Sequence, residues 1–288
     1  MHSLESAPTG VPEALATALR DRYVLEREIA RGGMATVVLA REVGREQAVA
    51  VKVMHPHVAT LIGAERFRRE IDLVRAMSHP GIVPLTDSGT AAGLFYYVMP
   101  FVDGETVYDR VRREGRFPLA DAIRVTHEVA SALGYAHDRG ILHRDVKPEN
   151  LLLTNGPAPV RALVADFGLA RAIGLANYQR LTETGIIVGT VFYMSPEQLR
   201  EERNLDQRAD IYSLGCILYE MLTGAPPFTG SSITDIIKRI LKGSVPSAAR
   251  ANRDVPPAVD AAIARALAKA PSDRFASMRD FSAALPPP

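Results

Sequence analysis

The chain has 288 residues, enough to bury a sizeable core as one large domain or two small ones. Hydrophobic residues make up 47% and charged residues 23%, ordinary values for a folded globular protein. The formal net charge of +1 argues against a general binder of nucleic acid or of a membrane surface. A single cysteine, Cys216, excludes an internal disulfide and a cysteine zinc cluster.

We expect neither a membrane span nor a secretory signal peptide in this sequence. No run approaches the roughly 18–20 apolar residues of a membrane span, and the N-terminus lacks a signal-peptide pattern. Cys216 lies in an apolar helical pattern, which indicates a core residue rather than a nucleophile. We therefore expect a reducing, cytoplasmic location and no membrane contact by this segment.

Residues 1–22 are expected to form an N-terminal extension with a short helix at Ala14–Arg20. From Tyr23 the pattern is extended, with β-rich runs at Val37–Leu39 and Ala48–Val53. Between the first two strands lies a turn of small residues, 30–35, with two glycines at its centre. Such a turn lets backbone N–H groups close over an anion, although most glycine turns merely connect strands.

A carboxylate that faces inward follows these strands. Ala64–Met77 is an amphipathic helix with Phe67 at its apolar face, and Glu70 shares the inward stripe. A buried glutamate needs a cation, and Lys52, at the end of an apolar strand, is the obvious one. Taken alone, Lys52 would be read as a lysine that reaches out to solvent.

The remaining elements change from strands to helices along the chain. Two more strands are expected at Ile82–Leu85 and Leu94–Met99, followed by a turn at 103–105. Strands first and helices afterwards, without alternation, predict two α+β lobes. Helical patterns occupy 119–139, 195–200, 208–223, 232–242, 257–269 and 276–284.

The segment 143–150 holds the densest group of chemically useful side chains. Asp145 and Lys147 are two residues apart, so in an extended loop their side chains leave on the same side. Asn150 lies just before the apolar run Leu151–Leu153. Phosphoryl transfer needs a carboxylate to orient a hydroxyl, a cation on the moving phosphate, and metal ligands. The alternative is a polar surface loop between a helix and a strand.

With Asp166-Phe167-Gly168, the motifs stand in the order and spacing of the protein kinases, which the chain resembles from residue 23 to about 284. The resemblance implies a two-lobed α+β fold, with an N-lobe and hinge at 23–102 and a C-lobe at 103–284. Residues 285–288 would begin a proline-rich linker. It implies catalytic roles for Asp145, Lys147, Lys52 and Glu70, and metal binding by Asn150 and Asp166. His143 is then a packing residue, Asp210 braces the catalytic loop, and Arg274 pairs with Glu197.

The resemblance also implies ATP as the phosphate donor and Mg²⁺ as the metal, for which Mn²⁺ can substitute. Lys147, and Gly189-Thr190 ahead of Tyr193, resemble serine/threonine rather than tyrosine kinases. The bacterial branch commonly joins a cytosolic kinase domain through a linker to a membrane span. The positions similar to the family's nucleotide-binding residues are Ala30, Gly32, Gly33, Ala35, Val37, Ala50, Lys52, Met99, Pro100, Val102, Glu105 and Leu152.

Two departures from the family pattern concern the nucleotide. Ala30 and Ala35 stand where the family has glycine, which is tolerated at negative φ but costs about 1 kcal/mol or more at positive φ. Pro100 replaces the usual hinge glutamate, yet it keeps the carbonyl that would meet the adenine amino group. The adenine ring would need the N–H of Val102. We interpret both departures as tuning rather than loss of nucleotide binding.

Regulation is expected at the activation segment. Arg144 adjoins the catalytic aspartate, and in the resembling kinases this arginine binds a phosphothreonine. Thr182 and Thr184 are the candidates for autophosphorylation in trans, and Thr190 is expected to hydrogen-bond within the catalytic loop. The alternative is that Thr182 and Thr184 are simply solvated loop residues.

Two other functions are alternatives to a protein kinase. A pseudokinase scaffold would bind nucleotide or partners without transfer, but such proteins usually lack one of Lys52, Asp145 and Asp166, all present here. A small-molecule phosphotransferase would lack the Gly-Thr and Ser-Pro-Glu segment between 189 and 197. The sequence therefore favours a kinase acting on serine and threonine hydroxyls of proteins, without a nucleic-acid partner.

Overall fold

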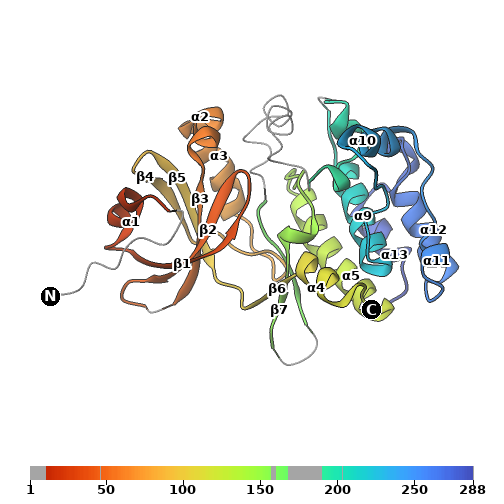
Figure 1. Ribbon diagram of the computed structural model, residues 1–288, viewed down its shortest axis with the longest axis horizontal. Helices are drawn as coiled ribbons and strands as arrows, with labels where there is room; N and C mark the ends of the chain where they lie inside the picture. The colour runs from red at the N-terminus through yellow and green to blue at the C-terminus, as the bar shows by residue number, and fades with distance from the viewer. Residues whose placement is uncertain (1–10, 46, 157–159, 168–189, 203, 288) are drawn as a thin grey trace. The chain divides into compact units, whose positions relative to one another are not determined.

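The computed structural model describes residues 11–287 except 46, 157–159, 168–189 and 203 (Figure 1). The described residues fall into two compact units. The first holds residues up to Ser78 together with Val83–Val102, and the second holds His79–Ile82 and the chain from Asp103 onward.

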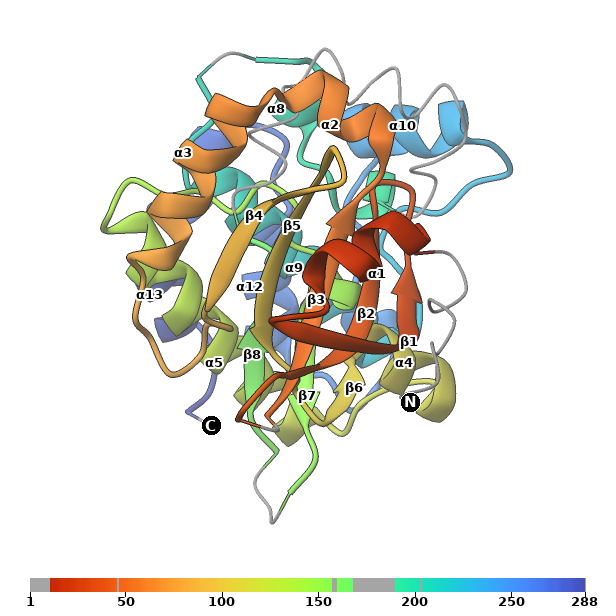
Figure 2. The same cartoon turned by 90° about the vertical axis from the view of Figure 1, so that its left-hand side faces the viewer.

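The first unit is built on a five-stranded antiparallel sheet with strand order β1-β2-β3-β5-β4. Alternate residues of each strand point to opposite faces. On one face, Val38, Val51 and Val98 pack with Leu15 and Leu19 of α1, which lies in front of the sheet in Figure 2. The bounds are α1 (Glu13–Leu19), β1 (Tyr23–Arg31), β2 (Ala35–Glu42), β3 (Ala48–Met54), β4 (Asp87–Ala91) and β5 (Leu94–Pro100).

Helix α3 (Ala64–Arg75) covers the opposite face of the sheet. Its Phe67 ring stacks on that of Phe95 in β5, with centroids 4.6 Å apart. A short helix that the sequence did not suggest, α2 (Pro56–Ile62), precedes α3. It begins with a proline at its first turn, where the missing N–H costs no hydrogen bond.

The predicted strand at Ile82–Leu85 is wrong, because β4 lies at Asp87–Ala91. Pro84 has no N–H to donate to a strand ladder. The apolar residues before it, Ile82 and Val83, are buried without being part of a strand. Ile82 forms an isolated parallel bridge to Val164 of the second unit. The true strand is polar and half-buried because it is the sheet's edge.

The second unit contains a small antiparallel sheet, β6-β7-β8, and most of the helices. Part of the predicted turn 103–105 forms β6, where a Cβ at Gly104 would lie 1.9 Å from the carbonyl oxygen of Leu153. Only glycine permits that approach. The strands are β6 (Gly104–Thr106), β7 (Leu151–Thr154) and β8 (Ala162–Val164), and the longer helices are α4 (Val107–Glu114), α5 (Leu119–His137), α9 (Arg208–Thr223), α10 (Ile233–Lys242) and α12 (Pro257–Ala266).

Helix α9 forms the centre of the second unit, since every residue from Ala209 to Leu222 is buried. It packs against α4, α5 and α12, the short helix α11 (Ala248–Ala251) and the 3₁₀ helix η2 (Thr190–Tyr193). The other short elements of this unit are α8 (Pro196–Leu199), α13 (Met278–Ala283), η1 (Pro148–Asn150) and η3 (Pro271–Asp273). No helix among the described residues is both long and apolar enough to cross a membrane. The α+β fold with a β-rich and a mainly helical part is confirmed.

Candidate active site

Four of the residues predicted to hold nucleotide share one face of the first unit's sheet. Val37 lies opposite Lys52, and Ala50 lies opposite Met99. Residues directly opposite each other in an antiparallel pair project to the same side. This face is the one that α1 leaves uncovered, so the strand register gathers side chains that are far apart in sequence.

The glycine turn keeps its shape despite the two alanines. The N–H of Gly32 donates to the carbonyl of Ala35 at 2.9 Å, and Ala30 pairs with Val37. Neither Ala30 nor Ala35 is among the described residues with positive φ. The alanines therefore carry no left-handed strain, which was the main risk of replacing glycine.

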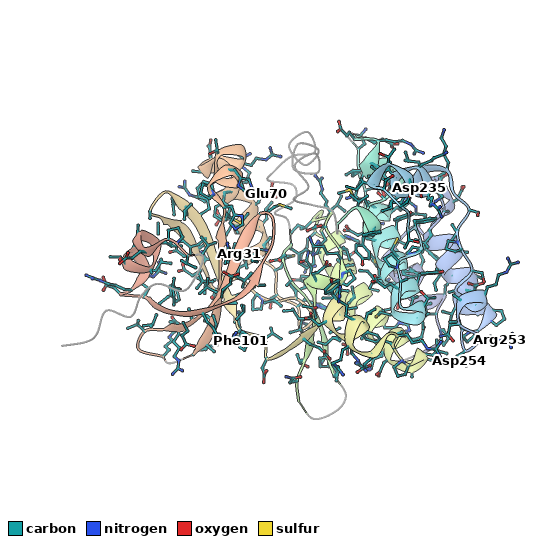
Figure 3. All side chains as sticks on the ribbon, viewed as in Figure 1. Arg31, Glu70, Phe101, Asp235, Arg253 and Asp254 are labelled. Atoms are coloured by element: carbon teal, nitrogen blue, oxygen red, sulfur yellow. The ribbon has the colours of Figure 1, made fainter. Side chains whose placement is uncertain are left out.

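Lys52 and Glu70 both belong to the first unit. Lys52 lies inside β3, which continues to Met54, rather than at its end, and its Nζ is 5.9 Å from the centroid of the Tyr97 ring. Glu70 is only 7% exposed and lies on α3, the helix that packs on the Lys52 face of the sheet (Figure 3). A buried carboxylate requires compensation, so this arrangement supports the predicted ion pair, which stays a prediction.

Pro100 ends β5 opposite Val49. The next N–H, that of Phe101, donates to the carbonyl of Ala48 at 3.2 Å, so the pairing with β3 continues past the proline. Val102 follows and is half-buried. The proline thus leaves the strand edge intact at this segment.

In the second unit, the catalytic-loop side chains contact one another directly. Lys147 Nζ donates to Asp145 Oδ2 at 2.8 Å, and Asn150 Nδ2 donates to the carbonyl oxygen of Asp145 at 2.8 Å. Burial alone would lower the pKa of Lys147, but the attraction and hydrogen bond of Asp145 outweigh burial and raise it. Lys147 is therefore a permanent cation beside the carboxylate at neutral pH.

A buried carboxylate, Asp210, fixes the backbone of this loop. It accepts the N–H groups of His143 at 2.9 Å and Arg144 at 2.8 Å. His137 Nε2 donates to the same carboxylate at 2.8 Å. Burial alone would raise the pKa of Asp210, but the hydrogen bond and charge of His137 outweigh it and lower the pKa. The bracing role of Asp210 is confirmed.

Two further residues to which the sequence assigned no role, His137 and Gln198, complete this support. Gln198 Nε2 donates to the carbonyl of Arg144 at 2.8 Å, which holds Arg144 at a φ of 67°. No local pattern reveals either residue, because each reaches the loop from a separate helix.

Asn150 and Asp166, the predicted metal ligands, are linked through the backbone. Asn150 is 6% exposed, and its carbonyl oxygen accepts the N–H of Ala165 at 2.9 Å. Because its Nδ2 is engaged by Asp145, the side-chain oxygen of Asn150 is the atom left to bind a cation. Two hard oxygen ligands with phosphate oxygens suit Mg²⁺. The described residues contain no cluster of three or more His, Cys, Asp or Glu that could hold a metal without such help.

His143 behaves as the packing residue that was expected. Its side chain is fully buried, its Nε2 donates to the carbonyl of Ala165 at 2.9 Å, and its ring lies 4.6 Å from that of Phe167. With one nitrogen committed to a carbonyl, the ring orders the residues before Asp166 rather than moving protons.

The remaining predicted residues of the second unit lie in its small sheet and at α8. Leu152 lies in β7 opposite Thr106, and Glu105 in β6 forms an ion pair with Arg113 at 2.6 Å. Arg274 forms two short hydrogen bonds to Glu197, at 2.6 and 2.7 Å, so that predicted pair is confirmed. Thr182, Thr184 and the side chain of Thr190 lie outside what the structure describes.

Comparison with known proteins agrees with this architecture. The family description "Protein kinase domain" matches residues 23–283. The chain is 40% identical over 272 residues to serine/threonine-protein kinase PknB of Mycolicibacterium smegmatis, which covers 93% of this chain and 43% of PknB. It is 39% identical over 265 residues to serine/threonine-protein kinase PknD of Mycobacterium tuberculosis, covering 91% of this chain and 39% of PknD.

A solved structure shares the fold. The PknI kinase domain of Mycobacterium tuberculosis has a TM-score of 0.71 and 31% identity, covering 91% of this chain and 94% of that chain. The chain spans less than half the length of the PknB and PknD proteins it matches. On its motifs, its fold and these relatives, the chain belongs to the protein kinase family, as a catalytic domain of the bacterial serine/threonine type.

Proposed function

We propose that the chain transfers the γ-phosphate of ATP to serine and threonine hydroxyls of proteins. The observation that carries this proposal is the contact of Lys147 Nζ with Asp145 Oδ2 at 2.8 Å, on a loop whose backbone Asp210 holds. It places a carboxylate that can orient a hydroxyl beside a cation that can bind a phosphate. The names of the relatives support the same substrate class.

In this mechanism Asp145 orients the acceptor hydroxyl and accepts its proton as the bond to phosphorus forms. The ammonium group of Lys147 stabilises the negative charge that develops on the transferred phosphate, and its raised pKa keeps it protonated. Because both groups are already held in place, little reorganisation is needed during transfer.

Asn150 and Asp166 would hold Mg²⁺, which neutralises the phosphate oxygens of ATP when bound. The Lys52 face of the first unit's sheet would receive the nucleotide, with Val37 and Ala50 against the adenine. Lys52, oriented by Glu70, would bind the α- and β-phosphates. Glu105 and Leu152, in the second unit, are the remaining proposed nucleotide-binding residues.

We further propose regulation by autophosphorylation in trans at Thr182 and Thr184, read by Arg144, and action in the cytoplasm. The protein's partners are then its substrates and further copies of itself. Support comes from the backbone of Arg144, which is held by hydrogen bonds to Asp210 and Gln198. The side chain that carries the guanidinium therefore extends from an anchored backbone.

The test is phosphorylation of a serine peptide by the purified chain with Mg·ATP, compared with Asp145→Asn. Asparagine keeps the shape of Asp145 but cannot take the proton, so we expect transfer to fall by roughly 10²–10⁴-fold while ATP binding persists. Asp138→Asn, an exposed position on the same helix–loop segment, is the control. Near-normal transfer by Asp145→Asn would refute the proposal.

A further inference from the structure

His55, the first residue after β3, makes three hydrogen bonds to the glycine turn and its flank. Its N–H donates to the carbonyl of Met34 at 2.9 Å. Its ring Nδ1 lies 3.1 Å from the carbonyl oxygen of Gly33, and Nε2 lies 3.1 Å from Thr36 Oγ1. One residue thus holds both the tip of the turn and the start of β2.

The partners determine which ring nitrogen carries the hydrogen. A carbonyl oxygen only accepts, so Nδ1 must donate to Gly33. In the neutral ring Nε2 then accepts the hydroxyl hydrogen of Thr36, which is 2% exposed. The neutral Nδ1–H form therefore satisfies every polar atom of this contact.

The turn needs such support because of its composition. Gly32 and Gly33 lose more conformational freedom on ordering than other residues. Within the turn, the N–H of Gly32 donates to the carbonyl of Ala35. The His55 bonds hold the Gly33 and Met34 carbonyls on the β3 side, which fixes the planes of the peptides that follow them.

We propose that His55 is a positioning residue of the nucleotide-binding turn: it orders the backbone at Gly33 and Met34 for the phosphates of ATP without touching the nucleotide. The inference rests on the proposed function, because it assigns a task within the same site. It predicts a specific signature. His55 supports binding of the triphosphate and leaves binding of the nucleoside unchanged, since the turn faces phosphates and not adenine.

The charged groups around the ring are Arg31 and Glu28 of β1 and His57 of α2. Arg31 Nε donates to Glu28 at 2.9 Å, and the His57 ring lies 5.7 Å away (Arg31 is labelled in Figure 3). Burial lowers the pKa of His55, and His57 and Arg31 lower it further, against the opposing effects of the Gly33 carbonyl and Glu28. The ring is therefore neutral at pH 7.

Protonation would disturb the contact with Thr36. Both ring nitrogens would then donate, and the buried hydroxyl of Thr36 would lose the acceptor for its own hydrogen. Because the pKa is lowered, this happens only as the pH falls below about 6.5, the ordinary value for histidine. The apparent KM for ATP should rise in that acidic range.

The experiment compares the affinities of Mg·ATP and adenosine, together with KM and kcat for peptide phosphorylation. His55→Phe removes both ring hydrogen bonds, and we expect about tenfold weaker Mg·ATP binding with adenosine affinity within about twofold. His55→Asn places an amide N–H where Nδ1 was, so it should restore most of the affinity and abolish the acidic rise in KM. His57→Phe, an exposed histidine two residues away, is the matched control.

The inference would be overturned if the ratio of Mg·ATP affinity to adenosine affinity were the same in His55→Phe and His57→Phe. It would also be overturned if His55→Phe lost affinity for both ligands equally. If His55→Phe fails to fold, His55→Asn and His55→Gln decide, since Asn keeps the Gly33 bond and Gln only reaches Thr36. Equal ATP affinity of these two variants would overturn it as well. A wild-type chain that neither binds Mg·ATP nor phosphorylates the peptide would instead refute the proposed function.

Discussion

Lys52 and Glu70 illustrate how a residue's role depends on the face that it shares. Lys52 lies on the face of the sheet that α3 covers, and Glu70 is buried on that helix. If they act as one unit, Lys52→Met and Glu70→Gln should each lower kcat/KM strongly. The double variant should then cost much less than the sum of the two free-energy losses.

The measurement is a double-mutant cycle on peptide phosphorylation at saturating peptide. Glu65→Gln, on the exposed first turn of the same helix, is the control and should behave as wild type. Strictly additive losses at Lys52 and Glu70 would show that no functional ion pair exists.

Glu220 is a second residue whose surroundings set its chemistry. Burial raises the pKa of this carboxyl from 4.5 to about 7, with a further contribution from Glu149 and an opposing one from the hydroxyl of Tyr193, which donates to Glu220 at 2.6 Å. The folded state therefore holds its proton more tightly than the unfolded state. Its stabilising contribution is complete below pH 4.5 and is lost as the pH rises to about 7.

We expect Glu220→Gln to remove this pH dependence, because glutamine keeps an acceptor for Tyr193 and never ionises. The gain in unfolding free energy at pH 8 should be on the order of 3 kcal/mol relative to wild type. Denaturant unfolding between pH 4.5 and 8 measures it, with exposed Glu202→Gln as the control. Parallel pH curves for wild type and Glu220→Gln would contradict the assignment.

At the scale of elements, α1 packs as part of the first unit's core. Leu15 and Leu19 are 0% and 2% exposed, against the same face as Val38 and Val51. Leu15→Ala should lower the unfolding free energy of this unit by about 2–5 kcal/mol, the usual cost of a cavity in a packed core. Val24→Ala, at a position 47% exposed, should change it by under about 0.5 kcal/mol. Thermal denaturation of both variants provides the comparison, and equal melting temperatures would show that α1 contributes no packing.

The elements that the sequence predicted well are those with local signals. The helix at 208–223 has the predicted bounds, because Gly224 adopts a φ of 84° and ends it. The strand at 82–85 was wrong because a buried apolar pair, Ile82 and Val83, looks like a strand from periodicity alone. Helix α4 was missed, although Thr106 and Asp109 form a capping box at its start.

In the active site, too, contacts between residues close in sequence could be predicted and contacts between distant residues could not. Asp145, Lys147 and Asn150 lie within six residues, so their spacing alone could suggest that they meet. The contact of His55 with Gly33 depends on how β2 pairs with β3 across 22 positions, and no local pattern specifies that register.

For the molecule as a whole, the activation segment should couple phosphorylation to turnover. A phosphate on Thr182 or Thr184 adds about −1.5 to −2 charges and can form charge-assisted hydrogen bonds with Arg144. We expect several-fold or greater activation on autophosphorylation, lost in the Thr182→Ala/Thr184→Ala variant. Arg144→Ala should remove the benefit of phosphorylation while lowering basal activity less.

Phosphosite mapping by mass spectrometry and peptide assays before and after phosphatase treatment measure this effect. Thr60→Ala, at an exposed threonine of α2, is the control. Equal activity of the phosphorylated and dephosphorylated enzymes would contradict the proposed switch.

The buried pair of Glu197 and Arg274 also bears on how the protein is made. The two residues are 77 positions apart, and the side chains are 5% and 0% exposed. A nascent chain that has passed Glu197 but not yet reached Arg274 would have to bury an uncompensated carboxylate, which typically costs 3–5 kcal/mol. Closure of the helical unit around α8 is therefore disfavoured until Arg274, which precedes α13, has left the ribosome, whereas the first unit's sheet is complete from residue 100 onward. We therefore expect the β-rich unit to fold before the helical unit during synthesis.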